Sequence, residues 1–137
     1  MNKKLLFIIL LAIIFSSCNE INPNKIIGKW QVTDIEVTDS EYSDQIIEEA
    51  KTSAMSISYN FINDSSFVLV TELFYNGMDG EWTYNPDDQT ITMEYLPKEG
   101  AQKIVYKIIS IKGEKMIWEM NMDGMGIITL TLTKKQL

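Results

Sequence analysis

From residue 26 onward the chain alternates between apolar and polar positions in short runs that end at turn residues. In the last run, Ile128, Leu130 and Leu132 fall on one face and threonines on the other, which is the two-residue period of a half-buried strand. Turn residues such as Asn76-Gly77 separate the runs. The pattern therefore predicts eight β-strands, over residues 26–38, 57–62, 67–75, 80–84, 90–96, 102–111, 114–121 and 125–133.

One segment, residues 41–56, departs from this pattern. Its apolar residues, from Ile46 to Met55, recur at helical spacing, and either Ser43 or Asp44 can cap the start. We therefore predict an amphipathic helix between the first two strands.

The connections between the strands that follow this helix are too short for crossovers, so neighbouring strands should pair as antiparallel hairpins. In the first strand, the step from Val32 to Ile35 breaks the alternation and predicts a bulge near Thr33-Asp34. Eight meandering strands close into a barrel, since closure removes the two exposed edges. We predict an all-β fold, an eight-stranded up-and-down antiparallel barrel with one helix inserted between strands 1 and 2. Its interior is wide enough to be filled by side chains or to hold one small ligand.

The N-terminal segment has a different character. Two lysines precede an unbroken apolar run over 5–15, which is short for a membrane span and typical of a signal peptide. Small residues lead from it into Cys18, the chain's only cysteine. This arrangement resembles the lipobox of bacterial lipoproteins, although Phe15 stands where an aliphatic residue is usual.

The resemblance implies that residues 1–17 are a signal peptide and that Cys18 is acylated with chains such as palmitate after cleavage. Residues 18–25 are polar and contain a proline, so we expect a short tether, followed by a barrel domain over 26–137. The expected location is the bacterial cell envelope, on the outer membrane, with the membrane face left open. Lipidated Cys18 is the expected membrane contact, because an acidic chain has no basic patch for anionic lipids.

Composition removes several kinds of chemistry. The chain of 137 residues has no histidine, no arginine and one cysteine, with a formal net charge of −7. These counts exclude a Ser–His–Asp triad, a histidine metal site and an internal disulfide, and they argue against nucleic acid as a partner. We predict no catalytic residues, no cofactor and no metal, and hence no enzyme.

Two Gly-x-Trp motifs, Gly28/Trp30 and Gly80/Trp82, occur in strands 1 and 4. Together with the Thr/Leu-alternating final strand they resemble lipocalin-like (calycin-type) domains of envelope lipoproteins. The resemblance implies that Gly28 and Trp30 close one end of the barrel. The arginine that stacks on this tryptophan in lipocalins is missing, and we expect Lys134 or Lys135 in its place. The long C-terminal helix of lipocalins is missing as well.

The resemblance also implies that the barrel binds a small apolar or amphipathic ligand. The alternative is a packed, ligand-free barrel that serves as a protein-interaction module of an envelope assembly. Methionines along strand 7 could bind Cu(I), but a flexible apolar lining explains them better. Glu94 and Glu119 are candidate polar groups of the pocket, with a solvent-facing position as the favoured reading. The candidate ligand-binding residues are Trp82, Tyr95, Tyr106, Met116, Trp118 and Met120.

Overall fold

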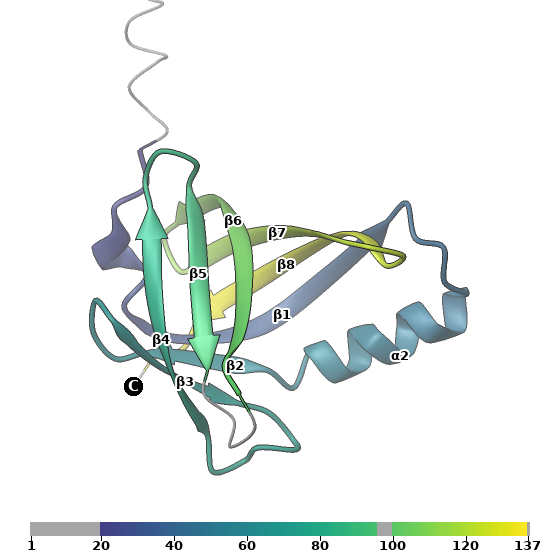
Figure 1. Ribbon diagram of the computed structural model, residues 1–137, viewed down its shortest axis with the longest axis horizontal. Helices are drawn as coiled ribbons and strands as arrows, with labels where there is room; N and C mark the ends of the chain where they lie inside the picture. The colour runs from purple at the N-terminus through teal and green to yellow at the C-terminus, as the bar shows by residue number, and fades with distance from the viewer. Residues whose placement is uncertain (1–19, 96–99, 137) are drawn as a thin grey trace, which may run out of the picture.

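A computed structural model describes residues 20–95 and 100–136 (Figure 1). The expected signal peptide and the acylated Cys18 lie outside the described residues. Within them, no helix is long and apolar enough to cross a membrane. The elements are η1 (Pro23–Lys25), β1 (Gly28–Thr38), α2 (Asp44–Ala54), β2 (Ser58–Phe61), β3 (Ser66–Val70), β4 (Met78–Asn85), β5 (Thr90–Tyr95), β6 (Gln102–Lys112), β7 (Lys115–Met122) and β8 (Gly126–Lys134).

The eight strands form a closed barrel in chain order, and β8 pairs with β1 to complete the circle. Every neighbouring pair is antiparallel. The predicted fold class, an up-and-down barrel with one helix between the first two strands, is thus confirmed. The structure also confirms the predicted bulge, since the β1–β8 register shifts between Val32 and Asp34.

One predicted strand is wrong in its extent. The run over 67–75 was expected to be extended throughout, but β3 ends at Val70 and residues 71–77 form a turn. The Thr71 hydroxyl oxygen accepts a hydrogen bond from the Phe74 amide at 3.1 Å, and the Gly77 amide donates to the Phe74 carbonyl at 2.9 Å. These local bonds replace strand pairing, and β4 begins two residues earlier than predicted.

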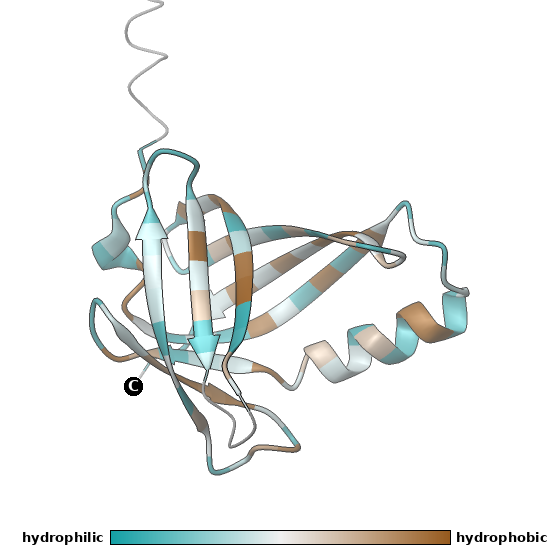
Figure 2. Cartoon of the chain, viewed as in Figure 1, coloured by the Kyte–Doolittle hydropathy of each residue, from teal (hydrophilic) through white to brown (hydrophobic). Residues whose placement is uncertain are grey.

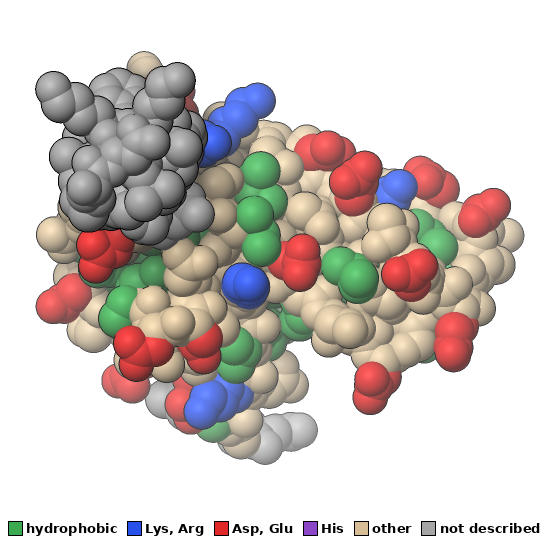
Figure 3. Space-filling view, turned by 90° about the horizontal axis from the view of Figure 1, so that it is seen from above, with side chains coloured by type: hydrophobic (Ala, Val, Ile, Leu, Met, Phe, Trp, Pro, Cys, Tyr) green, Lys and Arg blue, Asp and Glu red, His purple; other side chains and the backbone are tan. Residues whose placement is uncertain are grey.

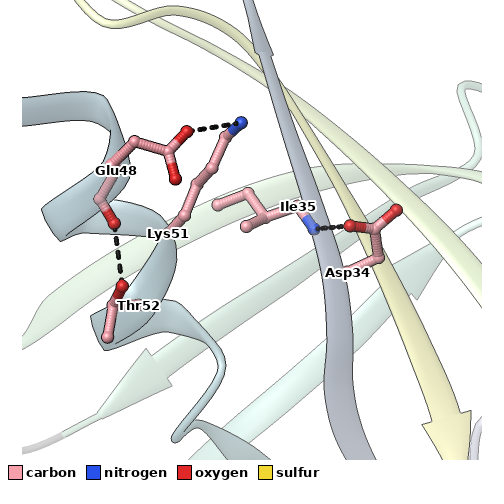
Figure 4. A network of polar contacts seen from close by, with 5 residues as sticks. All are labelled: Asp34, Ile35, Glu48, Lys51 and Thr52. Atoms are coloured by element: carbon pink, nitrogen blue, oxygen red, sulfur yellow. Dashed lines mark hydrogen bonds and ion pairs between the residues drawn. The ribbon is translucent and has the colours of Figure 1, made fainter. Parts of the chain in front are cut away.

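Helix α2 begins after Ser43, whose hydroxyl oxygen accepts from the Ile46 amide as an N-cap. On the surface of the helix, Glu48 and Lys51 form an ion pair at 3.4 Å (Figure 4). The β1 bulge lies beside this pair, and there the Asp34 side chain accepts a hydrogen bond from the Ile35 amide. The C-terminal end is tied to β1, because the Gln31 side chain donates to the carbonyls of Met55 and Ile57. Helix α2 therefore lies beside β1 and is held at one end.

The core consists of the inward faces of all eight strands, with apolar residues alternating along them (Figure 2). Among the described residues, every buried hydrophobic residue falls between Ile26 and Leu132. Hence a chain that begins at residue 19 keeps the whole core and should fold on its own.

Two ends of the barrel are distinguished below. The base carries the start of β1, the end of β8 and the β2–β3, β4–β5 and β6–β7 turns. The mouth carries the helical connection and the β3–β4, β5–β6 and β7–β8 connections. At the base the described chain begins with η1, capped by the Asn22 side chain, and Ile21 packs against the core. The tether predicted over 18–25 is thus folded against the barrel from Ile21 onward.

Candidate ligand-binding site

The six candidate ligand-binding residues all lie on inward faces of the barrel. Four of them are buried, and Tyr95 and Met120 are half-buried against the core. This placement follows from the pleat of the strands, in which residues two apart face the same side. The six candidates occupy the same alternate positions as the other apolar residues of their strands. The buried four are Trp82, Tyr106, Met116 and Trp118.

Aromatic rings from six strands, β2 to β7, meet in the interior. Trp118 is at the centre, with its ring centroid 5.0 Å from that of Tyr106 and 5.1 Å from that of Tyr59. Phe61 joins it to Trp82, at 6.2 and 5.3 Å respectively. Tyr59, Phe61 and Phe67 also lie on this inward face but are not among the six residues predicted from the sequence, although the alternation within their short apolar runs indicates an inward position. The three add an aromatic wall opposite β6 and β7.

Trp30 and Trp82 both brace the base of the barrel. The Trp30 indole nitrogen donates to the Ile26 carbonyl at 2.8 Å, and the Trp82 indole nitrogen donates to the Asn63 carbonyl at 2.9 Å. The first bond joins β1 to the segment just before it, and the second joins β4 to the β2–β3 turn. Trp82 therefore has a structural hydrogen bond, whereas the sequence suggested it only as a ligand contact.

The glycines of the two motifs make room for these contacts. Gly28 has φ +134, and a Cβ there would lie 2.6 Å from the Lys134 side chain. A Cβ at Gly80 would lie 2.5 Å from the Phe67 ring and 2.7 Å from the Glu94 carbonyl oxygen. The lack of a side chain leaves room for Lys134 beside Gly28, and for the Phe67 ring and the β5 backbone beside Gly80.

The third tryptophan differs from the other two. Trp118 is 0% exposed, and its indole nitrogen has no hydrogen-bond partner within the described part of the chain. Beside it, the hydroxyls of Tyr59 and Tyr106 share a hydrogen bond. Burial is the main cause that raises the pKa of Tyr106 to about 12, and it raises the pKa of Tyr59 well above the usual value. Both hydroxyls are therefore neutral donors at physiological pH.

Exposure varies along the inward faces. Near the base, Trp30, Met116 and Leu132 are 0% exposed, while Tyr84 and Ile111 are partly buried. Toward the mouth, Leu69 and Ile128 are buried. Five other inward residues there are partly buried, and they are Val37, Met78, Tyr95, Ile104 and Met120. The mouth is thus lined by apolar side chains that solvent reaches in part.

Two hollows flank the N-terminal segment on the outer surface at the base. The larger has a volume of about 470 Å³, and its lining includes Ile21, Ile27, Trp82 and Tyr84. The smaller, of about 180 Å³, lies between the same segment and β6. Only the edge of Trp82 reaches the larger hollow, since this side chain is 3% exposed.

The remaining candidate groups do not gather into a reactive site. Glu94 is exposed and Glu119 is half-buried on the outer face, which agrees with the solvent-facing reading. The methionines of β7 lie in different surroundings, since Met116 is buried while Met122 is 43% exposed. Within residues 20–95 and 100–136, no group of His, Cys, Asp or Glu side chains has a metal-binding arrangement.

A closed eight-stranded antiparallel barrel with an apolar interior and a half-open mouth has the architecture of lipocalin-like binding barrels. The chain belongs to the lipocalin-like domain family, whose model matches residues 26–118. A crystal structure of a lipocalin-like protein from Bacteroides uniformis has the same fold, with a TM-score of 0.56 and 19% sequence identity. The alignment covers 81% of this chain and 99% of that one. No curated protein matches the chain.

Proposed function

We propose that this protein is a lipid-anchored envelope protein whose barrel binds one small apolar or amphipathic molecule. The observation that carries the proposal is the set of apolar side chains that line the mouth. Inward apolar residues of five strands are only partly buried there, whereas a mouth closed by packing would bury them. Apolar side chains that line an opening and are in contact with solvent offer a binding site for an apolar ligand.

The proposed anchor fits this geometry. Acylation of Cys18 would place the membrane next to the base, since the described chain begins there at Glu20 and packs on the barrel through Ile21. The mouth lies at the other end of the strands (Figure 1). It would therefore open away from the anchoring membrane and receive ligands from the aqueous side.

Binding of a neutral apolar fluorophore, N-phenyl-1-naphthylamine, tests the proposal on the chain from residue 19 onward. We expect saturable binding of one dye per barrel. Met120→Trp, which adds bulk at the half-buried mouth, should weaken this binding. The matched control is Val105→Trp, which adds the same ring at a position that is 45% exposed on the outer face. Absence of saturable binding, or equal weakening by both substitutions, would contradict the proposal.

A second candidate function, docking of a protein partner, is favoured by the turn between β3 and β4. Leu73 is 86% exposed, Tyr75 77% and Phe74 48%. Three consecutive exposed apolar residues are unusual on a soluble surface and are typical of a contact site. Acidic residues surround them at the mouth, including Glu72 and Asp79.

The charge indicates the kind of partner. The turn is flanked by Glu72 and Asp79, and the whole chain has a formal net charge of −7. Acidic side chains also outnumber lysines over the α2 end of the molecule, away from the grey atoms (Figure 3). Such a surface suits a basic protein with an apolar centre better than an anionic membrane. Leu73→Ser with Tyr75→Ser should abolish such a complex, detected by crosslinking in the native host, while dye binding in the barrel stays unchanged. Loss of dye binding instead would make this turn part of the ligand site.

A further inference from the structure

The unpartnered indole nitrogen of Trp118 indicates what kind of ligand the barrel takes. Of the three tryptophans in the chain, Trp30 and Trp82 donate to main-chain carbonyls. Trp118 is equally buried, yet the described residues offer its N–H no acceptor. A buried donor without an acceptor costs free energy and is rare in native proteins, so its retention needs a reason.

A second donor lies next to it. Tyr106 has its ring centroid 5.0 Å from that of Trp118. The hydroxyls of Tyr59 and Tyr106 form one hydrogen bond with each other, which uses the proton of one of them. The proton of the other hydroxyl is therefore available, because each tyrosine hydroxyl carries one O–H donor. The interior thus presents two neighbouring donors.

No lysine is buried among the described residues. Apart from tyrosine and tryptophan, the only polar residue among their buried positions is Ser58. A carboxylate in this place would lose its hydration and meet no counter-charge, which is strongly unfavourable. An uncharged carbonyl oxygen needs donors and no cation, so it fits what the barrel supplies.

We propose that the barrel binds an uncharged amphipathic molecule, such as an ester or another neutral carbonyl compound, whose oxygen accepts a hydrogen bond from Trp118 and a second one from the hydroxyl pair of Tyr59 and Tyr106. The apolar part of the molecule then lies toward the mouth, along Tyr95, Ile104 and Met120. This inference rests on the proposed ligand-binding function and adds the polarity and direction of the ligand.

Three probes of one chain length separate the possibilities. Methyl laurate, laurate and dodecane each compete with N-phenyl-1-naphthylamine for the chain from residue 19 onward, at pH 8. We expect methyl laurate to displace the dye at an about tenfold lower concentration than dodecane, the gain from pairing the two donors. Laurate should compete least, because its carboxylate has no counter-charge in the interior.

Trp118→Phe removes the donor and keeps an aromatic ring. In this variant, the ratio of the dodecane concentration to the methyl laurate concentration that displaces the dye should fall about fivefold. The matched control is Trp30→Phe, which removes an indole whose N–H already donates to the Ile26 carbonyl at the base. That substitution should lower thermal stability and leave the ratio of the two probes unchanged.

A measurement on the unaltered protein covers the case in which Trp118→Phe does not fold. The chain has three indole N–H groups, which ¹⁵N NMR resolves. Methyl laurate should shift one of them, Trp118, to lower field. Equal competition by methyl laurate and dodecane with no indole shift would overturn this inference while the proposed function stands, and so would tighter binding of laurate. If the dye itself does not bind, both fail together.

Discussion

Lys134 covers Trp30 at the base of the barrel. The two residues are directly opposite each other in the β1–β8 pairing, and the Lys134 ammonium nitrogen lies 5.5 Å from the centroid of the Trp30 ring. This distance is typical of a cation–π contact. A lysine thus takes the place in which lipocalins have an arginine, as the sequence predicted. The contact joins the first and last strands where the barrel closes.

Replacing Trp30 with alanine should destabilise the fold strongly. The side chain is 0% exposed, and cutting a buried tryptophan to alanine typically costs about 3–5 kcal/mol. A domain of this size has a free energy of unfolding of only about 5–15 kcal/mol. Urea unfolding, followed by circular dichroism, measures the loss. A midpoint close to that of the wild type would mean that Trp30 does not close the barrel.

The buried tyrosines should make stability depend on pH in the alkaline range. In the unfolded chain both tyrosines titrate near pH 10, whereas burial raises the pKa of Tyr106 to about 12 and that of Tyr59 well above its usual value. Between these values the unfolded state releases protons that the folded state keeps. The free energy of unfolding should therefore be unaffected by these groups below about pH 10 and fall as the pH rises toward about 12.

Urea unfolding at a series of pH values checks this prediction. The double variant Tyr59→Phe, Tyr106→Phe should show a shallower decline above about pH 10 than the wild type. Identical slopes in the two proteins would show that the hydroxyls are not buried as described.

Much of the fold could be predicted because its signals are local. The two-residue period located the strands, the broken alternation after Val32 located a bulge, and Ser43 marked the start of α2. The turn over 71–77 could not be found in this way. Leu73, Phe74 and Tyr75 are apolar like strand residues, and only the pairing of β3 with β4 leaves them outside.

The site was predictable to a similar degree. The apolar period placed Tyr106 and Trp118 on inward faces, but it carries no information on hydrogen bonds between distant strands. That Tyr59 bonds to Tyr106, and that Trp118 is left without an acceptor, follows from contacts among β2, β6 and β7. The sequence alone treats the three tryptophans alike, and their hydrogen bonds distinguish them.

Helix α2 connects β1 to β2 at the mouth, and we predict that its apolar face gates this opening. The structure buries none of its residues, and Ile46 is 45% exposed. Ile46→Ser with Ile47→Ser should therefore lower stability only modestly, by about 1 kcal/mol. If α2 gates the mouth, N-phenyl-1-naphthylamine should enter and leave faster, as measured by stopped-flow fluorescence.

Glu49→Ser is the control for that experiment, since it changes the exposed face of the same helix. Unchanged exchange rates in the Ile46/Ile47 variant, or unfolding of the whole domain, would make α2 a structural brace.

The anchor is tested through Cys18. Expressed from its full sequence in a Gram-negative host, the wild type should incorporate labelled palmitate and fractionate with membranes. Cys18→Ala should do neither, because the thiol is the acceptor of the first lipid. Equal labelling of both proteins would refute the lipoprotein assignment and leave the barrel's binding function unaffected.

Native mass spectrometry tests the central claim most directly. The chain from residue 19 onward, exported by its native host behind a cleavable signal peptide without a lipobox cysteine and purified without detergent, should carry one small molecule per barrel. Its release on denaturation and its identity as an uncharged amphipathic compound are the expected results. The Met120→Trp variant, prepared in the same way, should carry less of it. A mass equal to that of the polypeptide alone, together with no uptake of N-phenyl-1-naphthylamine, would contradict a ligand-binding barrel.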